Sequence, residues 1–249
     1  MKKTTTLLLI AGTLCTMTAS AQSWKSWKKK AEDKTKEIKT NGLPSTGLSN
    51  EEVGAGLKEA LNQGVTKGVT QLHKKDGYFK DPQIKIPMPQ EAKNVEEKLR
   101  ALGQGEKVDE AIESMNRAAE DAAEGAKDIF VAAIKGMTLS DAMSILKGED
   151  DAATQYLNKA TREELSKKFR PIIKVSLDKV GATKHWNTLF KSYNKIPMVK
   201  KVNPDLEEYV TDKALDGLFI QVAKEELNIR KNPGARATDL LKKVFGSNN

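Results

Sequence analysis

The longest regular pattern in the chain is a run of apolar residues separated alternately by four and three positions. It comprises Val108, Ile112, Met115, Ala119, Ala122, Ala126, Ile129 and Ala133. This spacing places the side chains on one face of an α-helix, as in a helical bundle. Small residues in the middle favour close packing against a second helix, and Gly125 is a candidate break. The pattern therefore predicts an all-α protein.

Helix-start signals recur along the rest of the chain. A capping residue such as Ser, Thr, Asp or Asn predicts where a helix begins, most strongly when an acid follows three positions later or proline takes the first helical position. Pro171 interrupts the pattern that follows one of these starts and predicts a kink or break. With a helix over 90–102 and a last one ending at Gly246, we expect a single bundle-like domain of about eight to ten helices over residues 49–246. The predicted starts are Ser49, Thr138, Asp150 or Asp151, Thr161 and Asn203.

Two segments have the composition of deeply packed helices. Ala60, Gly64 and Gly68 lie four residues apart, which predicts the close approach of another backbone, with room for a ligand as the alternative. Residues 214–223 are apolar except for Asp216 and Gln221, so we expect them to form the central buried helix. The proline-containing segment 73–90 is predicted to be an extended arm, because proline cannot donate a backbone hydrogen bond.

The charge of the chain is unevenly distributed. The formal net charge is +8, but residues 22–40 alone hold seven lysines against three acidic residues, and the body is nearly neutral. A nearly neutral body argues against a nucleic-acid partner. Segment 106–151 is acidic and segment 162–201 is basic, so the two either pack together or solvate separate faces. An anion-binding groove on the basic segment is an alternative.

The N-terminus has the features of a secretory signal peptide over residues 1–21. Two lysines precede a short apolar run at positions 7–14, which leads to Ala19-Ser20-Ala21. We expect cleavage before Gln22 and a periplasmic mature protein without a transmembrane helix. The single cysteine, Cys15, lies in the removed piece and follows Leu14 rather than the Gly or Ala of a lipobox. A lipoprotein is therefore not expected.

Residues 22–48 form a basic tail and linker. Trp24, Trp27, Ala31 and Ile38 share one stripe of a helix, and lysines surround them. The tail is either a solubilising tether or a peripheral membrane anchor, in which Trp lies at the headgroups and Lys contacts anionic lipid. The candidate membrane contacts are Trp24, Trp27, Lys28, Lys29 and Lys30.

Motifs for catalysis and metal binding are missing from the sequence. His73 and His185 are the only histidines, and the mature chain would have no cysteine, so neither a zinc site nor a Ser-His-Asp triad is predicted. No glycine-rich nucleotide fingerprint is present either. We therefore expect no metal, no cofactor and no catalytic residue.

Several polar residues lie on helices that should be buried. Because an unpaired buried charge is costly, we expect these groups to form ion pairs with one another. The alternative is a polar pocket in which Arg117, Arg230 or Arg236 binds a carboxylate or phosphate through two hydrogen bonds. The candidate network comprises Asn116, Arg117, Glu120, Lys213, Asp216, Glu226, Arg230 and Arg236.

The same segments resemble a known family. Residues 48–52, 102–105, 114–120, 209–219 and 238–246 are similar, in the same order, to the bacterial domain-of-unknown-function family 4197. The resemblance implies an exported, all-helical protein of Gram-negative bacteria. It implies no activity and no functional residues, and the tryptophan- and lysine-rich tail lies outside it.

We expect a non-enzymatic binding or cell-envelope interaction module whose partner is an anionic small molecule or an envelope protein. One rival is a hydrolase with an unrecognised carboxylate site, which loss of turnover in Asp216→Asn or Glu120→Gln would favour. The other is a peripheral membrane protein anchored by its tail. Flotation with anionic vesicles that is unchanged after deletion of residues 22–40 would exclude the second rival.

Overall fold

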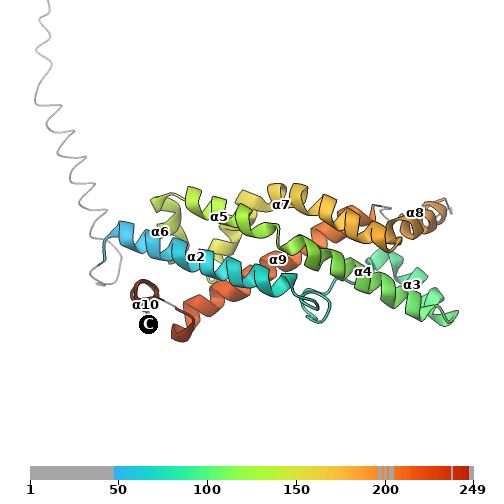
Figure 1. The fold of residues 1–249 in the computed structure, drawn as a ribbon, viewed down its shortest axis with the longest axis horizontal. Helices are drawn as coiled ribbons and strands as arrows, with labels where there is room; N and C mark the ends of the chain where they lie inside the picture. Colours follow the sequence, from blue (N-terminus) through green and yellow to red (C-terminus); the bar gives the residue numbers. More distant parts are fainter. Residues whose placement is uncertain (1–47, 196–197, 199–200, 202–204, 237, 247–249) are drawn as a thin grey trace, which may run out of the picture. The chain divides into compact units, whose positions relative to one another are not determined.

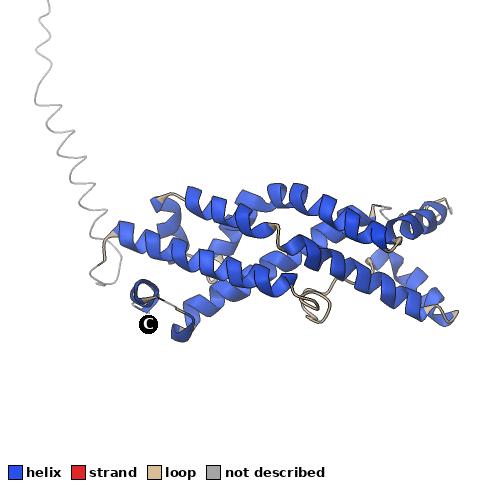
Figure 2. Ribbon diagram, viewed as in Figure 1, coloured by secondary structure: helices blue, strands red, loops and turns tan. Residues whose placement is uncertain are grey.

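The computed structural model describes residues 48–246, apart from 196–197, 199–200, 202–204 and 237. Within these residues the chain forms nine α-helices, two short 3₁₀ helices and no strand (Figure 1 and Figure 2). The prediction of an all-α domain with about eight to ten helices is therefore confirmed. The α-helices are α2 (Asn50–His73), α3 (Lys93–Ala101), α4 (Gly105–Ala123), α5 (Ala126–Gly136), α6 (Leu139–Lys147), α7 (Ala152–Lys179), α8 (Ala182–Tyr193), α9 (Leu206–Lys231) and α10 (Asp239–Gly246); the 3₁₀ helices are η1 (Gln90–Ala92) and η2 (Pro233–Ala235).

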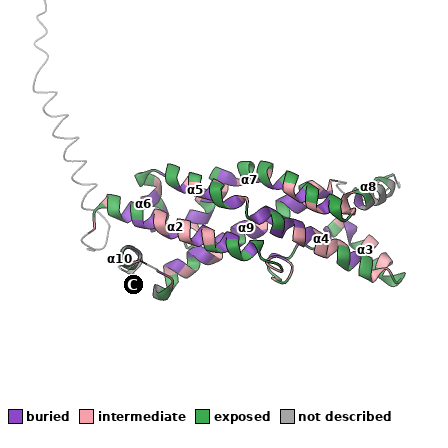
Figure 3. Cartoon of the chain, viewed as in Figure 1, coloured by how far each residue is buried: buried purple, intermediate pink, exposed green. Residues whose placement is uncertain are grey.

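Helix α9 lies at the centre of the packing, as its apolar composition predicts. It contacts α2, α4, α7 and α8, and Figure 3 shows buried residues along much of its length. Leu215 and Leu218 are fully buried, and the Phe219 ring packs edge-to-face on Phe130 of α5 with centroids 5.8 Å apart. Burial of these side chains removes apolar surface from water, which is the main favourable contribution to folding.

The glycine stripe of α2 is where α9 crosses it. A Cβ atom at Gly64 would lie 3.3 Å from Ile229 Cδ1, and one at Gly68 would lie 3.5 Å from Gln221 Cγ. The prediction that another helix packs closely on this stripe is confirmed. Helix interiors disfavour glycine by about 1 kcal/mol, so the gain in packing offsets a cost in helix propensity.

The seam helix is divided at the predicted position. Helix α4 ends at Ala123 and α5 begins at Ala126, with Gly125 N–H donating to Ala122 O in the turn between them. Most of the seam residues are buried, among them Val108, Met115 and Ala119. The acidic α4 packs directly against the basic α7, so these segments meet.

The prediction of two helices between residues 151 and 180 is wrong, because α7 continues through both expected boundaries. Thr161 is buried, and its hydroxyl donates to Leu157 O at 2.7 Å instead of capping a new helix. A threonine can make this backward bond inside a helix. Pro171 also lies within α7, on an exposed position where water can solvate the carbonyl that lost its N–H partner.

The other helix starts follow their sequence signals more closely. Ser49 with Glu52 and Thr138 with Asp141 each form a complete capping box, at the starts of α2 and α6. The N-cap of α9 is Asp205, whose carboxylate accepts from Glu208 N–H at 2.9 Å. The start predicted at Asn203 and Pro204 lies outside the described residues.

Residues 74–89, here called the arm, run from the end of α2 across the middle of α9. Tyr78 is fully buried, and its hydroxyl donates to Ala214 O of α9 at 2.8 Å. Gly217 of α9 lies directly under the Tyr78 ring: a Cβ there would come within 2.6 Å of Tyr78 Cε1. The remaining apolar residues of the arm, Ile84, Ile86 and Met88, are also buried.

We predict that Gly217→Ala destabilises the protein by about 1–3 kcal/mol, because the added methyl group would overlap the Tyr78 ring. The free energy of unfolding is measured by urea denaturation. Gly136→Ala is the matched control, since Gly136 also lies in a helix but a Cβ atom added there would meet nothing within 4 Å. That variant should be neutral or more stable by up to about 1 kcal/mol. Equal stability of the two variants would contradict the close approach of Tyr78 to α9.

Candidate functional site

The eight polar residues predicted to interact lie at three separate places in the fold. Asn116, Arg117 and Glu120 are on α4 beside the arm. Lys213 and Asp216 are near the middle of α9, on its half-exposed side. Glu226, Arg230 and Arg236 lie near the end of α9 and just beyond it. The structure therefore brings them together as three local groups.

Glu120 is the centre of the first group. Its carboxylate is buried, and Oε1 accepts hydrogen bonds from the backbone N–H groups of Tyr78 and Phe79, both at 3.1 Å. Its other oxygen, Oε2, accepts from Arg117 at 2.7 Å. The guanidinium of Arg117 also contacts Asp76 of the arm at 2.7 Å. The buried negative charge is thus matched by one cation and two backbone donors.

Asn116 holds the arm one helical turn away. Its Oδ1 accepts from Ile86 N–H at 2.8 Å, and its Nδ2 donates to Ile86 O at 2.9 Å and to Ile112 O at 2.8 Å. The amide is fully buried, and three of its hydrogen-bonding positions are used. Asn116 therefore gives Ile86 the pair of backbone hydrogen bonds that a neighbouring strand would otherwise supply.

The charges of this group shift the pKa values of their neighbours. Hydrogen bonds from Lys80 and Arg117 hold the pKa of the Asp76 carboxyl below its usual range. Partial burial opposes the charged form of Arg117, but hydrogen bonds to Glu120, Asp76 and Glu113 raise the pKa of its guanidinium overall. Burial raises the pKa of Tyr78 well above the ordinary phenol value. In each case the pKa moves in the direction that favours the form found in the hydrogen bonds: ionised Asp76, charged Arg117 and protonated Tyr78.

The group at the end of α9 caps another helix. The Glu226 carboxylate accepts from the backbone N–H groups of Ala153 and Thr154, at 3.0 and 2.8 Å, and from the Thr154 hydroxyl at 2.8 Å. The local N-cap, Asp151, makes no side-chain capping bond, so Glu226 supplies the acceptor from a distant helix. Arg230 pairs with Glu226 at 2.8 Å and also donates to Ile145 O.

Arg236 and Asp216, the remaining predicted residues, also bind groups of this chain. Arg236 is buried and donates to the backbone carbonyls of Ile229 and Arg230, at 3.1 and 2.8 Å. Asp216 pairs with Lys213 at 3.2 Å and with Arg162 of α7 at 2.8 Å. The three arginines considered as anion ligands, Arg117, Arg230 and Arg236, thus already bind carboxylates or carbonyls of this chain. The tail candidates Trp24, Trp27, Lys28, Lys29 and Lys30 lie outside the described residues.

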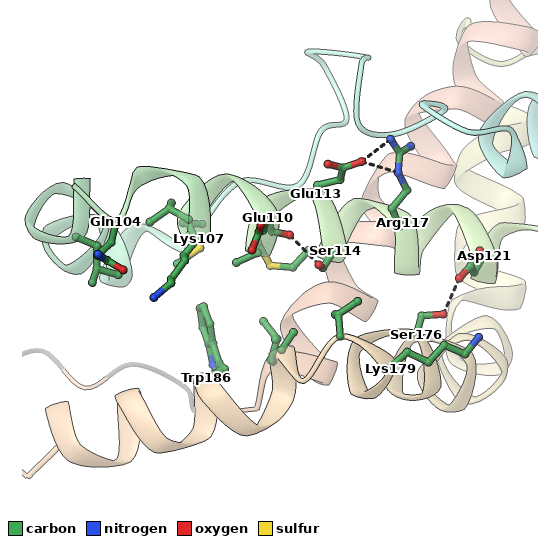
Figure 4. A pocket seen from close by; sticks show the side chains of 18 residues that line it. Gln104, Lys107, Glu110, Glu113, Ser114, Arg117, Asp121, Ser176, Lys179 and Trp186 are labelled. Atoms are coloured by element: carbon green, nitrogen blue, oxygen red, sulfur yellow. Dashed lines mark hydrogen bonds and ion pairs between the residues drawn. The ribbon is translucent and has the colours of Figure 1, made fainter. Parts of the chain in front are cut away.

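A pocket of about 1040 Å³ lies between α4 on one side and the end of α7 and α8 on the other (Figure 4). Trp186 rises from α8 toward α4, and Lys107 lies beside it. At the other end, Asp121 of α4 accepts a hydrogen bond from Ser176 of α7 at 2.6 Å. Much of the wall is apolar and includes Met88, Val108, Met115, Trp186 and Leu206.

Sequence reasoning identified only one residue of this pocket, Arg117, as a candidate for function. The residues it missed include Lys107, Glu110, Lys179 and Trp186. The tryptophan of the basic segment was an available signal, because aromatic side chains are common in the walls of small-molecule sites. The opposite charges of segments 106–151 and 162–201 allowed for packing of α4 against α7, but they did not indicate a pocket between α4 and the α7–α8 corner.

Comparison with known proteins gives the family of the chain. Residues 47–246 match the family described as "Protein of unknown function (DUF4197)". The chain belongs to the DUF4197 family. No curated protein and no solved structure matches this DUF4197 member. The family match covers all of the described helices, from α2 to α10.

Among the described helices of this DUF4197 chain, none is by itself long and apolar enough to span a membrane. Helices α5 and α6 meet the length and composition requirements only as a pair, across a bend of 104°.

We predict that Glu120→Ala destabilises the DUF4197 domain by about 3 kcal/mol or more, because it leaves two arm N–H groups and part of Arg117 without their acceptor. Urea denaturation measures the loss. Glu113→Ala is the matched control: it removes another partner of Arg117, but the Glu113 side chain is 47% exposed. That change should cost less than about 1 kcal/mol. Similar losses in both variants would argue against the role of Glu120 in holding the arm.

Proposed function

We propose that this DUF4197 protein is a non-enzymatic binding protein of the bacterial cell envelope, and that the pocket between α4 and the α7–α8 corner is its binding site. The observation that carries the proposal is the pocket itself. Its volume of about 1040 Å³ is at the upper end of the range for small-molecule sites. Its wall combines nine apolar residues with nine polar or charged ones, and an apolar wall with polar groups that orient a ligand is typical of such sites.

The arrangement of the buried carboxylates supports binding rather than catalysis. Glu120 and Glu226 each accept two backbone N–H bonds, and each is also bound by an arginine, through one hydrogen bond at Glu120 and two at Glu226. The fold thus uses both carboxylates as acceptors. A general acid or base must exchange a proton with a substrate. Neither Glu120 nor Glu226 lines the pocket, so neither is placed to do so there.

We further propose that residues 1–21 direct export and that the mature protein begins at Gln22 in the periplasm, with residues 22–48 as its basic tail. The proposal rests on the charged start, the apolar run and the Ala19-Ser20-Ala21 end.

Expressed in a Gram-negative host, the protein should be recovered from the periplasmic fraction with an intact mass that lacks residues 1–21. Leu8→Arg, which interrupts the apolar run, is the matched control and should keep the full-length chain in the cytoplasm. Full-length wild-type protein in the cytoplasm would contradict export. An acylated N-terminal Cys15 would contradict cleavage at residue 22.

The binding proposal is tested with N-phenyl-1-naphthylamine, a neutral apolar dye whose fluorescence rises on leaving water. We expect one dye to bind per chain with a micromolar Kd. Ala111→Trp, which adds a large side chain to the pocket wall, should weaken binding about tenfold or more. Ala132→Trp on the exposed face of α5 is the matched control and should bind as the wild type does. An absence of dye binding, or equal affinity in both variants with unchanged circular dichroism, would refute the proposal.

A further inference from the structure

The charges around the pocket indicate which class of molecule it holds. We infer that the ligand is a long-chain carboxylate: a single apolar chain with an anionic head that lies beside Lys107. This inference rests on the proposed function, because it names the ligand of the same pocket. It follows from the apolar wall, from the lining charges that make no ion pair with the described residues, and from where those charges lie.

Several elements build the apolar part of the wall, and its buried side chains come from four of them. Met88 comes from the arm, Val108 and Met115 from α4, Trp186 from α8 and Leu206 from the start of α9. These side chains are buried in the fold and still line the pocket. A chain of methylene groups placed among them would lose contact with water, and each fully buried CH₂ would tighten binding about fourfold.

Three of the six charged residues that line the pocket are already engaged. Arg117 binds three carboxylates, one of which is Glu113, and Asp121 accepts from Ser176. The other three, Lys107, Lys179 and Glu110, make no side-chain ion pair with any described residue. The charges available to a ligand are therefore two cations and one anion, which favours a ligand with a negative head.

The two lysines lie toward opposite ends of the pocket (Figure 4). Lys107 extends into the gap beside Trp186, and the polar side chain of Gln104 lies at the same end. Lys179 points toward the end where Asp121 lies, and the carboxylate of Asp121 would repel an anionic head there. The head is therefore placed at Lys107, and Lys179 becomes the matched control for it.

The negative charge of Glu110 disfavours an anionic head at Lys107, and this effect provides a test of the inference. It lies on α4 one turn after Lys107, and its side chain is exposed. An anionic head at Lys107 would be repelled weakly by Glu110, whereas a cationic head would be attracted. Removing the charge of Glu110 should thus strengthen the binding of an anion and weaken the binding of a cation.

The experiment is displacement of bound N-phenyl-1-naphthylamine from the full chain at low ionic strength. The competitors are dodecanoate, dodecan-1-ol, dodecyltrimethylammonium and butanoate, each below its aggregation concentration. We expect dodecanoate to bind about two- to fivefold more tightly than dodecan-1-ol, as an exposed charge pair allows, and dodecyltrimethylammonium to bind more weakly than both. Butanoate should not compete, because its chain buries little apolar surface.

The variants locate the head. Lys107→Met retains an unbranched apolar stem but removes the charged ammonium group, so dodecanoate and dodecan-1-ol should then bind equally. Lys179→Met should keep the wild-type preference, and Glu110→Gln should increase it by up to about twofold. In a Trp24→Phe, Trp27→Phe background, Trp186 is the only tryptophan, so a change in its emission on adding dodecanoate reports binding at the pocket itself.

The possible outcomes separate this inference from the proposed function. If the dye binds but the three competitors with a twelve-carbon chain compete equally, or the ammonium compound competes best, the pocket binds apolar molecules and the inference of an anionic head is wrong. Loss of the preference in Lys179→Met but not in Lys107→Met would overturn the position of the head. Effective competition by butanoate would contradict the inference that the ligand has a long apolar chain. Failure of the dye to bind the wild type would overturn both proposals together.

Discussion

The buried carboxylate of Glu120 is the group on which the position of the arm depends. The arm has no strand partner within the described residues, so its backbone N–H groups need acceptors from side chains. Glu120 accepts from two of them, and Arg117 makes the burial of its charge tolerable. The fixed turn then directs Tyr78 onto α9, where its hydroxyl reaches Ala214 and its ring lies against Gly217. One ionised side chain on α4 thereby sets how α2, the arm and α9 fit together.

The pocket depends on the same helix. Asn116 holds Ile86, two residues before Met88, and Met88 forms part of the pocket wall. Val108 and Met115 of α4 contribute to that wall as well. Helix α4 therefore holds the arm with its polar residues and shapes the pocket with its apolar ones. A buried polar network of this kind fixes geometry more than it adds stability, since much of its interaction energy offsets desolvation.

Local signals in the sequence were enough for most of the helices, and the exceptions have physical reasons. Capping boxes at Ser49 and Thr138 involve residues three apart, so their spacing already defines the interaction. Thr161 carries the same spacing to Glu164, yet its burial in α7 favours the bond to Leu157 O. The choice between a helix cap and a continuous helix therefore depended on tertiary packing around Thr161, and the spacing of residues gives no information about that packing.

The same distinction applies to the candidate site. Pairs three or four residues apart, Lys213 with Asp216 and Glu226 with Arg230, can be read from the sequence because a helix brings them together. The hydrogen bond from Tyr78 N–H to Glu120 joins residues that are 42 positions apart, so it could not be read from the sequence. The pocket was missed for the same reason. Its wall combines Met88, Val108, Trp186 and Leu206, which come from four elements whose pairing depends on the whole fold.

The cap that Glu226 places on α7 also bears on the order of assembly. The N–H groups in the first turn of α7 bind the carboxylate of Glu226, which lies 72 residues after Thr154 in the sequence. Until α9 has been synthesised, that turn has no such acceptor and water must solvate its N–H groups. Completion of α7 is thereby coupled to the arrival of the C-terminal third of the chain. Contacts of such long separation slow folding, because the entropy of closing a long loop must be lost before the contact forms.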